Sequence, residues 1–210
     1  MPFDEKMEAL MADTHQVFSE KETEQTWSSF NSQLRKWEQL VTDTVASSRA
    51  SAVSPGTTGL PLNHPLRARL TSTLGPYGGI APYIQTSIIS ERTILSATAC
   101  DMVKAVAAGL GLEFDSLVEV FGPSLLKLCQ RSNKVFTKRA EDTIFAMIDD
   151  SKSVRWVPLL CENMSKANKN RQAKASAARS LVKFLQVAEY VVGVDGSADA
   201  ITVAISEVRF

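Results

Sequence analysis

The chain has 210 residues, 44% of them hydrophobic, and its 23 basic residues balance its 23 acidic ones. This length and apolar content suffice for one elongated domain or two small ones with a real core, and they exclude disorder of the whole chain. Because no apolar run approaches the roughly 20 residues that span a bilayer, and the N-terminus is acidic where a signal peptide is basic, we expect a soluble intracellular protein.

The even total hides an uneven distribution of charge. Residues 1–24 hold seven acidic residues against two lysines, whereas residues 127–183 hold thirteen basic residues against five acidic ones. The second region should attract an acidic surface. Nucleic acid is a disfavoured partner, because the net charge is zero and no aromatic platform interleaves the basic residues.

Taken in chain order, residues 1–20 form an acidic N-terminal extension, and the domain occupies residues 21–210. Its first helix is predicted from an apolar stripe at the spacing of one buried helical face: Trp27, Phe30, Leu34, Trp37 and Leu40-Val41. A Ser/Pro/Gly-rich insertion follows at about residues 46–65. Its prolines and glycines disfavour a helix, so the composition predicts a flexible loop.

Two short helices should follow this insertion. The pattern predicts one over residues 66–74 and another over residues 81–89, and the Gly/Pro-rich segment 75–79 separates them.

A regular repeat begins at Ser90. Three segments present the same helical face, with spacings of 41 and 37 residues: Ala99/Val103/Ala107, Ala140/Ile144/Ile148 and Ala177/Leu181/Leu185. A second helix is predicted after each, over residues 114–128, 154–164 and 198–208. A period of about 40 residues built from paired helices is typical of HEAT or armadillo repeats. The sequence therefore predicts an all-α fold, a HEAT-repeat solenoid of paired antiparallel helices, although no capping repeat closes its C-terminal end.

The sequence offers no enzyme site, cofactor motif or metal site. His15 lies in the acidic segment and His64 in the proline-rich loop, so neither is placed beside a nucleophile on a regular element. Asp149-Asp150 lacks a third nearby ligand for a cation. The three cysteines are widely spaced: Cys100, Cys129 and Cys161. This spacing predicts buried, reduced thiols.

The turns carry the polar signal, because a helical solenoid aligns its turns along one edge. Four segments before the first helix of a repeat combine small polar residues that cap helices with a basic or aromatic side chain: Thr26-Trp27, Ser90–Thr93, Ser132–Val135 and Asn168–Arg171. Stacked on one edge, these segments would form a narrow stripe with an aromatic end and a basic body.

These segments resemble a known family. Residues 26–37, Thr-Trp-Ser-Ser-Phe-Asn-Ser-Gln-Leu-Arg-Lys-Trp, are similar to the opening of a CLASP-type TOG domain, in which a short linker ends in Trp and leads into a basic helix. Residues 90–100 and 132–140 resemble the second and third repeats of such domains, and residues 169–185 a later repeat. The likeness spans roughly residues 20–205.

The resemblance implies a TOG domain that binds tubulin or microtubules through its turns and regulates microtubule dynamics. It implies a place in the cytoplasm on the microtubule cytoskeleton and spindle, within a longer multi-domain protein. Carried over by position, the tubulin contacts are Trp27, Arg92, Thr93, Asn133, Lys134, Lys169 and Arg171. The repeat pattern alone leaves an alternative, a HEAT scaffold that does not bind tubulin and takes a peptide on second-helix faces that carry Glu119 or Arg155.

Overall fold

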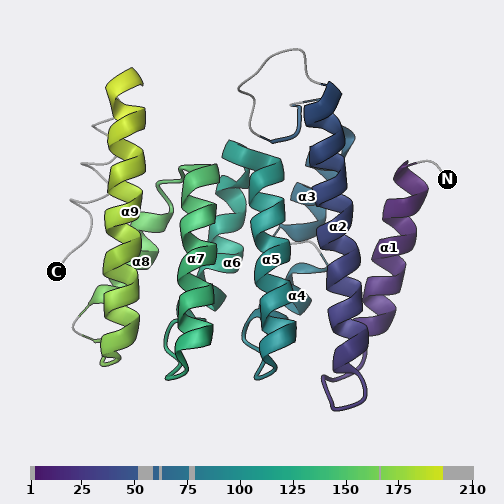
Figure 1. Cartoon of the computed structure of the whole chain (residues 1–210), viewed down its shortest axis with the longest axis horizontal. Helices are drawn as coiled ribbons and strands as arrows, with labels where there is room; N and C mark the ends of the chain where they lie inside the picture. The colour runs from purple at the N-terminus through teal and green to yellow at the C-terminus, as the bar shows by residue number, and fades with distance from the viewer. Residues whose placement is uncertain (1–2, 52–58, 62, 76–78, 166, 196–210) are drawn as a thin grey trace.

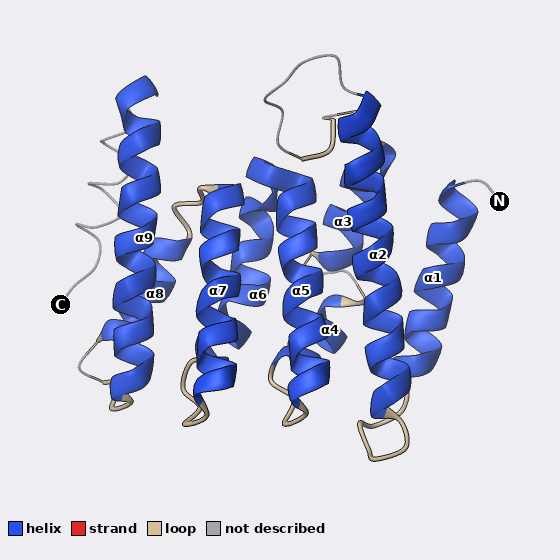
Figure 2. Ribbon diagram, in the orientation of Figure 1, coloured by secondary structure: helices blue, strands red, loops and turns tan. Residues whose placement is uncertain are grey.

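The computed structural model describes residues 3–51, 59–61, 63–75, 79–165 and 167–195. The helices are α1 (Phe3–Phe18), α2 (Trp27–Ser51), α3 (Pro65–Leu74), α4 (Ala81–Ile88), α5 (Thr93–Leu110), the 3-10 helix η1 (Gly111–Phe114), α6 (Asp115–Leu128), α7 (Lys134–Ser151), α8 (Trp156–Met164) and α9 (Arg171–Asp195). Within these described ranges every regular element is helical (Figure 2).

The helices form two layers. Helices α2, α5, α7 and α9 stand side by side as a front layer, and α3, α4, α6 and α8 lie behind them (Figure 1). Helix α4 packs on α5 and α6, helix α6 packs on α7 and α8, and α8 packs on α9. Each helix therefore contacts mainly its neighbours along the row, as in a solenoid.

This arrangement confirms the predicted all-α HEAT-type solenoid. The repeated helical faces are the ones that neighbouring front helices bury, since Ala99, Ala140 and Ala177 are all fully buried. Leu185, from the third repeat of the pattern, is 39% exposed. It lies on α9, the last helix of the described chain, so no described helix follows to cover that side.

Short connections join each second-layer helix to the front helix that follows it. Residues 89–92 join α4 to α5, residues 129–133 join α6 to α7, and residues 165–170 join α8 to α9. The sequence pattern paired each front helix with the helix after it. The pairs α4–α5, α6–α7 and α8–α9 instead put the polar turns inside the repeats.

Helix α1 packs on α2 at the N-terminal end of the row (Figure 1). The ring of Phe18 stacks on that of Phe30 with centroids 4.5 Å apart, and the buried Thr14 Oγ1 accepts a hydrogen bond from Trp37 Nε1 at 2.8 Å. The acidic segment predicted over residues 1–20 therefore includes a docked helix, because its apolar face matches that of α2.

The predicted insertion begins later than the sequence indicated. Helix α2 continues to Ser51 because no proline or glycine precedes Pro55 to stop it. Residues 52–58 and 62 lie outside the described residues, and the prediction of a flexible loop falls largely on them.

Arg67, a buried arginine on α3, anchors residues 59–61, which belong to the predicted insertion. Arg67, 6% exposed, donates hydrogen bonds to the carbonyl oxygens of Leu60 and Leu110, and its Nε donates to Glu113 Oε2 at 2.8 Å. These bonds hold residues 59–61 against the C-terminal end of α5. The guanidinium thus satisfies two buried carbonyl groups that would otherwise be costly.

The helix predicted over residues 198–208, and with it the missing capping repeat, lies outside the described residues.

Thr93–Leu128 is long and apolar enough to cross a membrane by composition, yet 61% of its apolar window is buried within the fold. Because core helices pass the same test, this segment is weak evidence for a membrane span.

Candidate functional site: an edge formed by four turns

Four turns lie along one edge of the solenoid, at the bottom of Figure 1. They precede α2, α5, α7 and α9 and comprise residues 19–26, 89–92, 129–133 and 167–170. We call this surface, which includes the first residue of each of these four helices, the turn edge, and we number its turns from the N-terminus. Residues separated by tens of positions in the sequence thus become neighbours in space, as the turn pattern predicted.

The predicted contact residues occupy equivalent positions on this edge. Trp27, Thr93, Lys134 and Arg171 are each the first residue of their front helix. Their register follows from helix capping, and Asn133 Oδ1 accepts a hydrogen bond from the Val135 backbone at 2.9 Å as the cap of α7. The first side chains of the four front helices therefore lie along the same edge of the solenoid.

The first and second turns are joined by an acidic cluster around Arg92. The Arg92 guanidinium makes a two-pronged contact with Glu24, at 2.6 and 3.3 Å, and its Nε lies 3.3 Å from Glu22 Oε1. Its carbon Cζ lies 5.5 Å from the centre of the Trp27 ring. Ser90 Oγ also donates to Glu22, at 2.6 Å. Arg92 therefore already has partners, and it covers part of the predicted aromatic contact.

This pairing shifts the acid–base equilibria of both groups. The hydrogen bond from Arg92, with its positive charge, lowers the pKa of Glu24 below its ordinary value. The same hydrogen bond raises the pKa of Arg92. Both groups stay charged at neutral pH, so the N-terminal end of the edge carries compensated charge.

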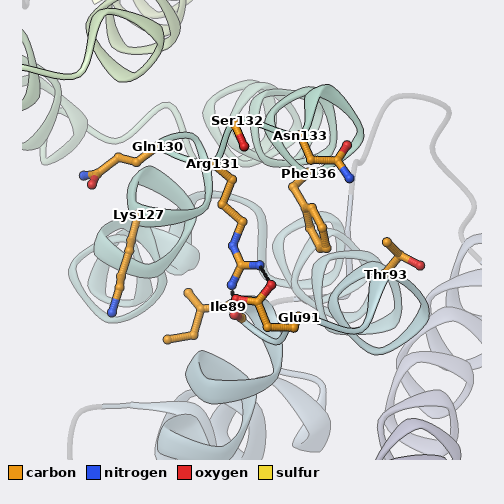
Figure 3. A pocket seen from close by; sticks show the side chains of 9 residues that line it. All are labelled: Ile89, Glu91, Thr93, Lys127, Gln130, Arg131, Ser132, Asn133 and Phe136. Carbon is orange, nitrogen blue, oxygen red and sulfur yellow. Dashed lines mark hydrogen bonds and ion pairs between the residues drawn. The ribbon is translucent and has the colours of Figure 1, made fainter.

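The second and third turns enclose a hollow of about 810 Å³. Arg131 lies at its centre and points toward Ile89 and Glu91, as Figure 3 shows. It donates to the Ile89 carbonyl oxygen and, at 2.6 Å, to Glu91 Oε2. The guanidinium also lies 4.9 Å from the centre of the Phe136 ring. This arginine therefore ties the two turns together.

The fourth turn continues this chain of contacts. Asn170 Nδ2 donates to the Gln130 carbonyl oxygen at 2.8 Å, which joins the third turn to the fourth. Lys134, Lys169 and Arg171 are exposed, and none of them forms an ion pair with another described residue. The C-terminal half of the edge therefore carries uncompensated positive charge.

The predicted stripe of turn residues lies on the turn edge, but its positive charge is distributed differently from the prediction. The structure brings Trp27, Arg92 and Thr93 together at one opening, and Thr93 and Asn133 line the hollow beside it. The predicted basic body is confined to the third and fourth turns, because glutamates neutralise Arg92. Lys134, Lys169 and Arg171 make up the open basic part.

The sequence reasoning missed two kinds of residue on this edge. Ile94 and Val135, the second residues of α5 and α7, are 54% and 55% exposed and add apolar surface beside Trp27 and Lys134. Both residues are the second residue of a front helix, and this shared position could have identified them from the sequence. Arg131 had no such signal, since a basic residue in a basic region resembles ordinary solvated charge.

The alternative peptide-binding surface lies on the second layer. Arg155 pairs there with Asp115 at 2.6 Å and with Glu119 at 2.8 Å. The hydrogen bond that Arg155 donates to Asp115, followed by the one it donates to Glu119, raises the pKa of Arg155. The two residues named for a peptide contact therefore bind each other across α6 and the start of α8.

The histidines and cysteines have structural positions. His15 packs edge-on against Tyr83, and His64 Nδ1 accepts the Leu66 backbone N–H at the start of α3. The three cysteines are buried free thiols, as predicted: Cys100, Cys129 and Cys161. Within the described ranges, no group of three or more His, Cys, Asp or Glu side chains could hold a metal ion.

Fold and edge together define a class of protein, a HEAT-type α-solenoid whose aligned turns form an interaction surface. The family model described as CLASP N terminal matches residues 77–199, which is more than half of the chain. The chain belongs to this CLASP family, and its fold is TOG-like, as the resemblance implied.

Curated relatives agree with this assignment. Protein STU1 of Chaetomium globosum is 22% identical over 162 residues, which are 75% of this chain and 13% of the relative. Protein stu-1 of Neurospora crassa is 24% identical over 139 residues, 66% of this chain and 10% of the relative. Protein stu1 of Aspergillus fumigatus is 30% identical over 99 residues, 46% of this chain and 7% of the relative. The chain thus spans 7% to 13% of these relatives' length.

Proposed function

We propose that this chain is a microtubule-associated, tubulin-binding domain that contacts tubulin through the turn edge and regulates microtubule dynamics without a catalytic step. Membership of the CLASP family supports the partner class. The proposed contacts are Trp27, Arg92, Thr93, Asn133, Lys134, Lys169 and Arg171. The proposed place of action is the cytoplasm, on microtubules and the spindle.

The observation that carries this proposal is the common edge. Lys134, Lys169 and Arg171 come from two different turns, yet they lie on one line with the half-buried Trp27 at its other end. Charge complementarity with an acidic partner speeds encounter and fixes orientation, and a tryptophan anchor supplies apolar contact area. An elongated acidic surface such as tubulin fits this arrangement.

Arg92 has a different proposed role from the open cations. Because Glu22 and Glu24 hold it against Trp27, we propose that it orients the indole ring and contacts the partner only with what remains exposed. Removal of Arg92 should therefore weaken binding partly by loosening Trp27.

The short span relative to the relatives supports a further proposal about organisation. If the chain acts within a longer protein, as the coverage of 7% to 13% suggests, other domains would bind the same filament at the same time. Linked weak sites then gain affinity from their high effective concentration. A modest affinity of the isolated domain would be consistent with this role.

Binding of the purified chain to soluble tubulin and to stabilised microtubules tests the proposal. The edge variant is Lys134→Gln/Lys169→Gln/Arg171→Gln. Its control, Lys36→Gln/Lys104→Gln/Lys152→Gln, removes the same charge away from the turn edge. We expect the edge variant to lose at least about tenfold in affinity and the control to lose little, because only the edge charges face the partner.

Trp27→Ala completes the test. Loss of a tryptophan anchor should weaken binding by roughly tenfold or more. Raised salt should weaken the wild-type interaction, because exposed charges are screened beyond about 8–10 Å at physiological ionic strength. Equal losses in the edge variant and the control, or no binding by the wild type, would contradict the proposal. Loss of tubulin binding on Arg155→Gln alone would indicate a contact on the second layer and not on the turn edge.

A further inference from the structure

The hollow between the second and third turns contains an arginine whose charge partner is almost entirely exposed. Arg131 has a side chain that is 22% exposed, while the carboxylate it pairs with, on Glu91, is 88% exposed. The pairing of a partly buried cation with a freely solvated carboxylate is weak, because water can replace the carboxylate at little cost. The position of Arg131 depends instead on its other contacts.

Those other contacts hold the guanidinium in place. Arg131 donates to the Ile89 carbonyl oxygen and lies over the Phe136 ring, which is 4% exposed. The Cζ atom of Arg139 lies 5.8 Å from the centre of the same ring, and Arg139 donates to the Thr93 carbonyl oxygen at 2.8 Å. Phe136 is thus a fixed platform, and the guanidinium on it is preorganised.

The surroundings of the hollow favour a negative ligand. Figure 3 shows Lys127 on one side of Arg131 and Phe136 on the other, with Glu91 below. Lys127 and Arg131 both line the hollow, and Glu91 is its one acidic lining residue among those described. Ser132 and Asn133 add polar groups at its rim. An entering carboxylate would meet two cations once Glu91 moved aside.

We propose that Arg131 is a binding site for a carboxylate side chain of the acidic partner, and that Glu91 is an internal stand-in which this carboxylate displaces. The proposal deepens the tubulin-binding function and rests on it. Arginine suits this role because its planar fork bonds both oxygens of a carboxylate. Glu91 keeps the charge of Arg131 compensated in the free domain.

The neighbouring arginine shows why this site differs. Arg92 also pairs with a very exposed glutamate, Glu24 at 79% exposure, but a second and more buried acid, Glu22, remains beside it. Displacement of Glu24 would therefore leave Arg92 paired. Among the described residues Arg131 pairs with one carboxylate, that of Glu91. Displacement of Glu91 therefore leaves the guanidinium of Arg131 free to pair with the partner.

Glu91→Gln tests the inference directly. With the stand-in carboxylate removed, affinity for tubulin and for a synthetic poly-glutamate peptide should rise by about two- to fivefold, as expected for the loss of one exposed ion pair that competes with the ligand. The matched control is Glu119→Gln, which removes the same charge from an exposed Arg–Glu pair on the second layer. This control should leave both affinities unchanged.

Arg131→Gln and Arg131→Lys test the arginine side of the proposed site. Both should weaken binding of the peptide, and the glutamine variant more than the lysine variant, because lysine retains the charge without the fork. Melting temperatures identify any variant whose turn is disrupted. Unchanged or weaker binding by Glu91→Gln, or an equal gain in Glu119→Gln, would overturn the inference.

The two proposals fail in different ways. If wild-type chain binds tubulin through the edge and Glu91→Gln leaves that affinity unchanged, the carboxylate site is wrong and the function stands. If wild-type chain binds no tubulin, the proposed function is wrong, and the poly-glutamate arm still decides whether Arg131 takes a carboxylate.

Discussion

The Arg92 guanidinium carbon lies 5.5 Å from the centre of the Trp27 indole ring, although the two residues belong to different turns. Glu24 holds the outer nitrogens of that guanidinium, so the aromatic end of the turn edge is preassembled. A surface that is already ordered loses less conformational entropy on binding.

This relationship predicts a pH dependence at the first turn. The pKa of Glu24 is lowered in the folded state, so its carboxylate contributes stability above the ordinary value of 4.5 and loses it as pH falls through the lower folded pKa. The stability difference between wild type and Glu24→Gln should therefore be small but present at pH 7 and should vanish in strong acid. Urea unfolding at a series of pH values measures it, and a difference that grew below pH 4 would contradict the assignment.

Thr14 should be important for the docking of α1 on α2. Its hydroxyl donates to the Leu10 carbonyl oxygen at 2.6 Å and accepts from Gln33 and Trp37 at 2.9 and 2.8 Å. Thr14→Val leaves buried donors without an acceptor and should cost about 1–3 kcal/mol of unfolding free energy.

The control for Thr14 is Thr44→Val on α2. Thr44 makes one hydrogen bond, to the Leu40 carbonyl oxygen at 2.6 Å, and leaves no other donor unsatisfied among the described residues. Its loss should cost less than about 1 kcal/mol. Equal costs in chemical unfolding would show that the α1–α2 polar cluster does not stabilise the fold.

Arg67 should stabilise the junction between residues 59–61 and α5. Arg67→Met removes the donor for two buried carbonyl oxygens, at Leu60 and Leu110, and should cost about 2–3 kcal/mol. Arg69→Met, on the exposed side of the same helix, should cost less than about 1 kcal/mol because its ion pair with Glu8 is exposed. Thermal unfolding of both variants compares them, and a larger loss for Arg69→Met would refute this account.

The cysteines should react slowly in the folded chain. Burial raises the pKa of Cys100 to about 11 and that of Cys129 to about 12, and burial also raises the pKa of Cys161. At pH 8 few thiolates form, so a disulfide reagent should label the native chain slowly and the unfolded chain rapidly. Cys161, at 8% exposure, should be the first to react. Fast labelling of Cys100 or Cys129 would contradict their burial.

The sequence predicted what depends on local periodicity. The repeated faces at Ala99, Ala140 and Ala177 indicated the solenoid, since each face recurs at helical spacing. The alignment of Lys134 with Trp27 on one edge followed from the repeat. These features need no knowledge of distant contacts.

The charge state of the edge could not be predicted in the same way. Arg92 and Glu24 are 68 residues apart, and the pair forms only because α2 and α5 pack side by side and bring the turns before them together. Arg131 and Glu91 are 40 residues apart. No spacing rule links such pairs, so cations that looked equal in the sequence differ in whether a partner can reach them.

The most direct test of the central claim is amide hydrogen exchange of the chain with and without saturating tubulin. The account predicts slower exchange in the four turns, at residues 19–26, 89–92, 129–133 and 167–170, with helices α6 and α8 unchanged. Protection confined to α6 and α8, or no protection anywhere at saturation, would contradict a tubulin site on the turn edge.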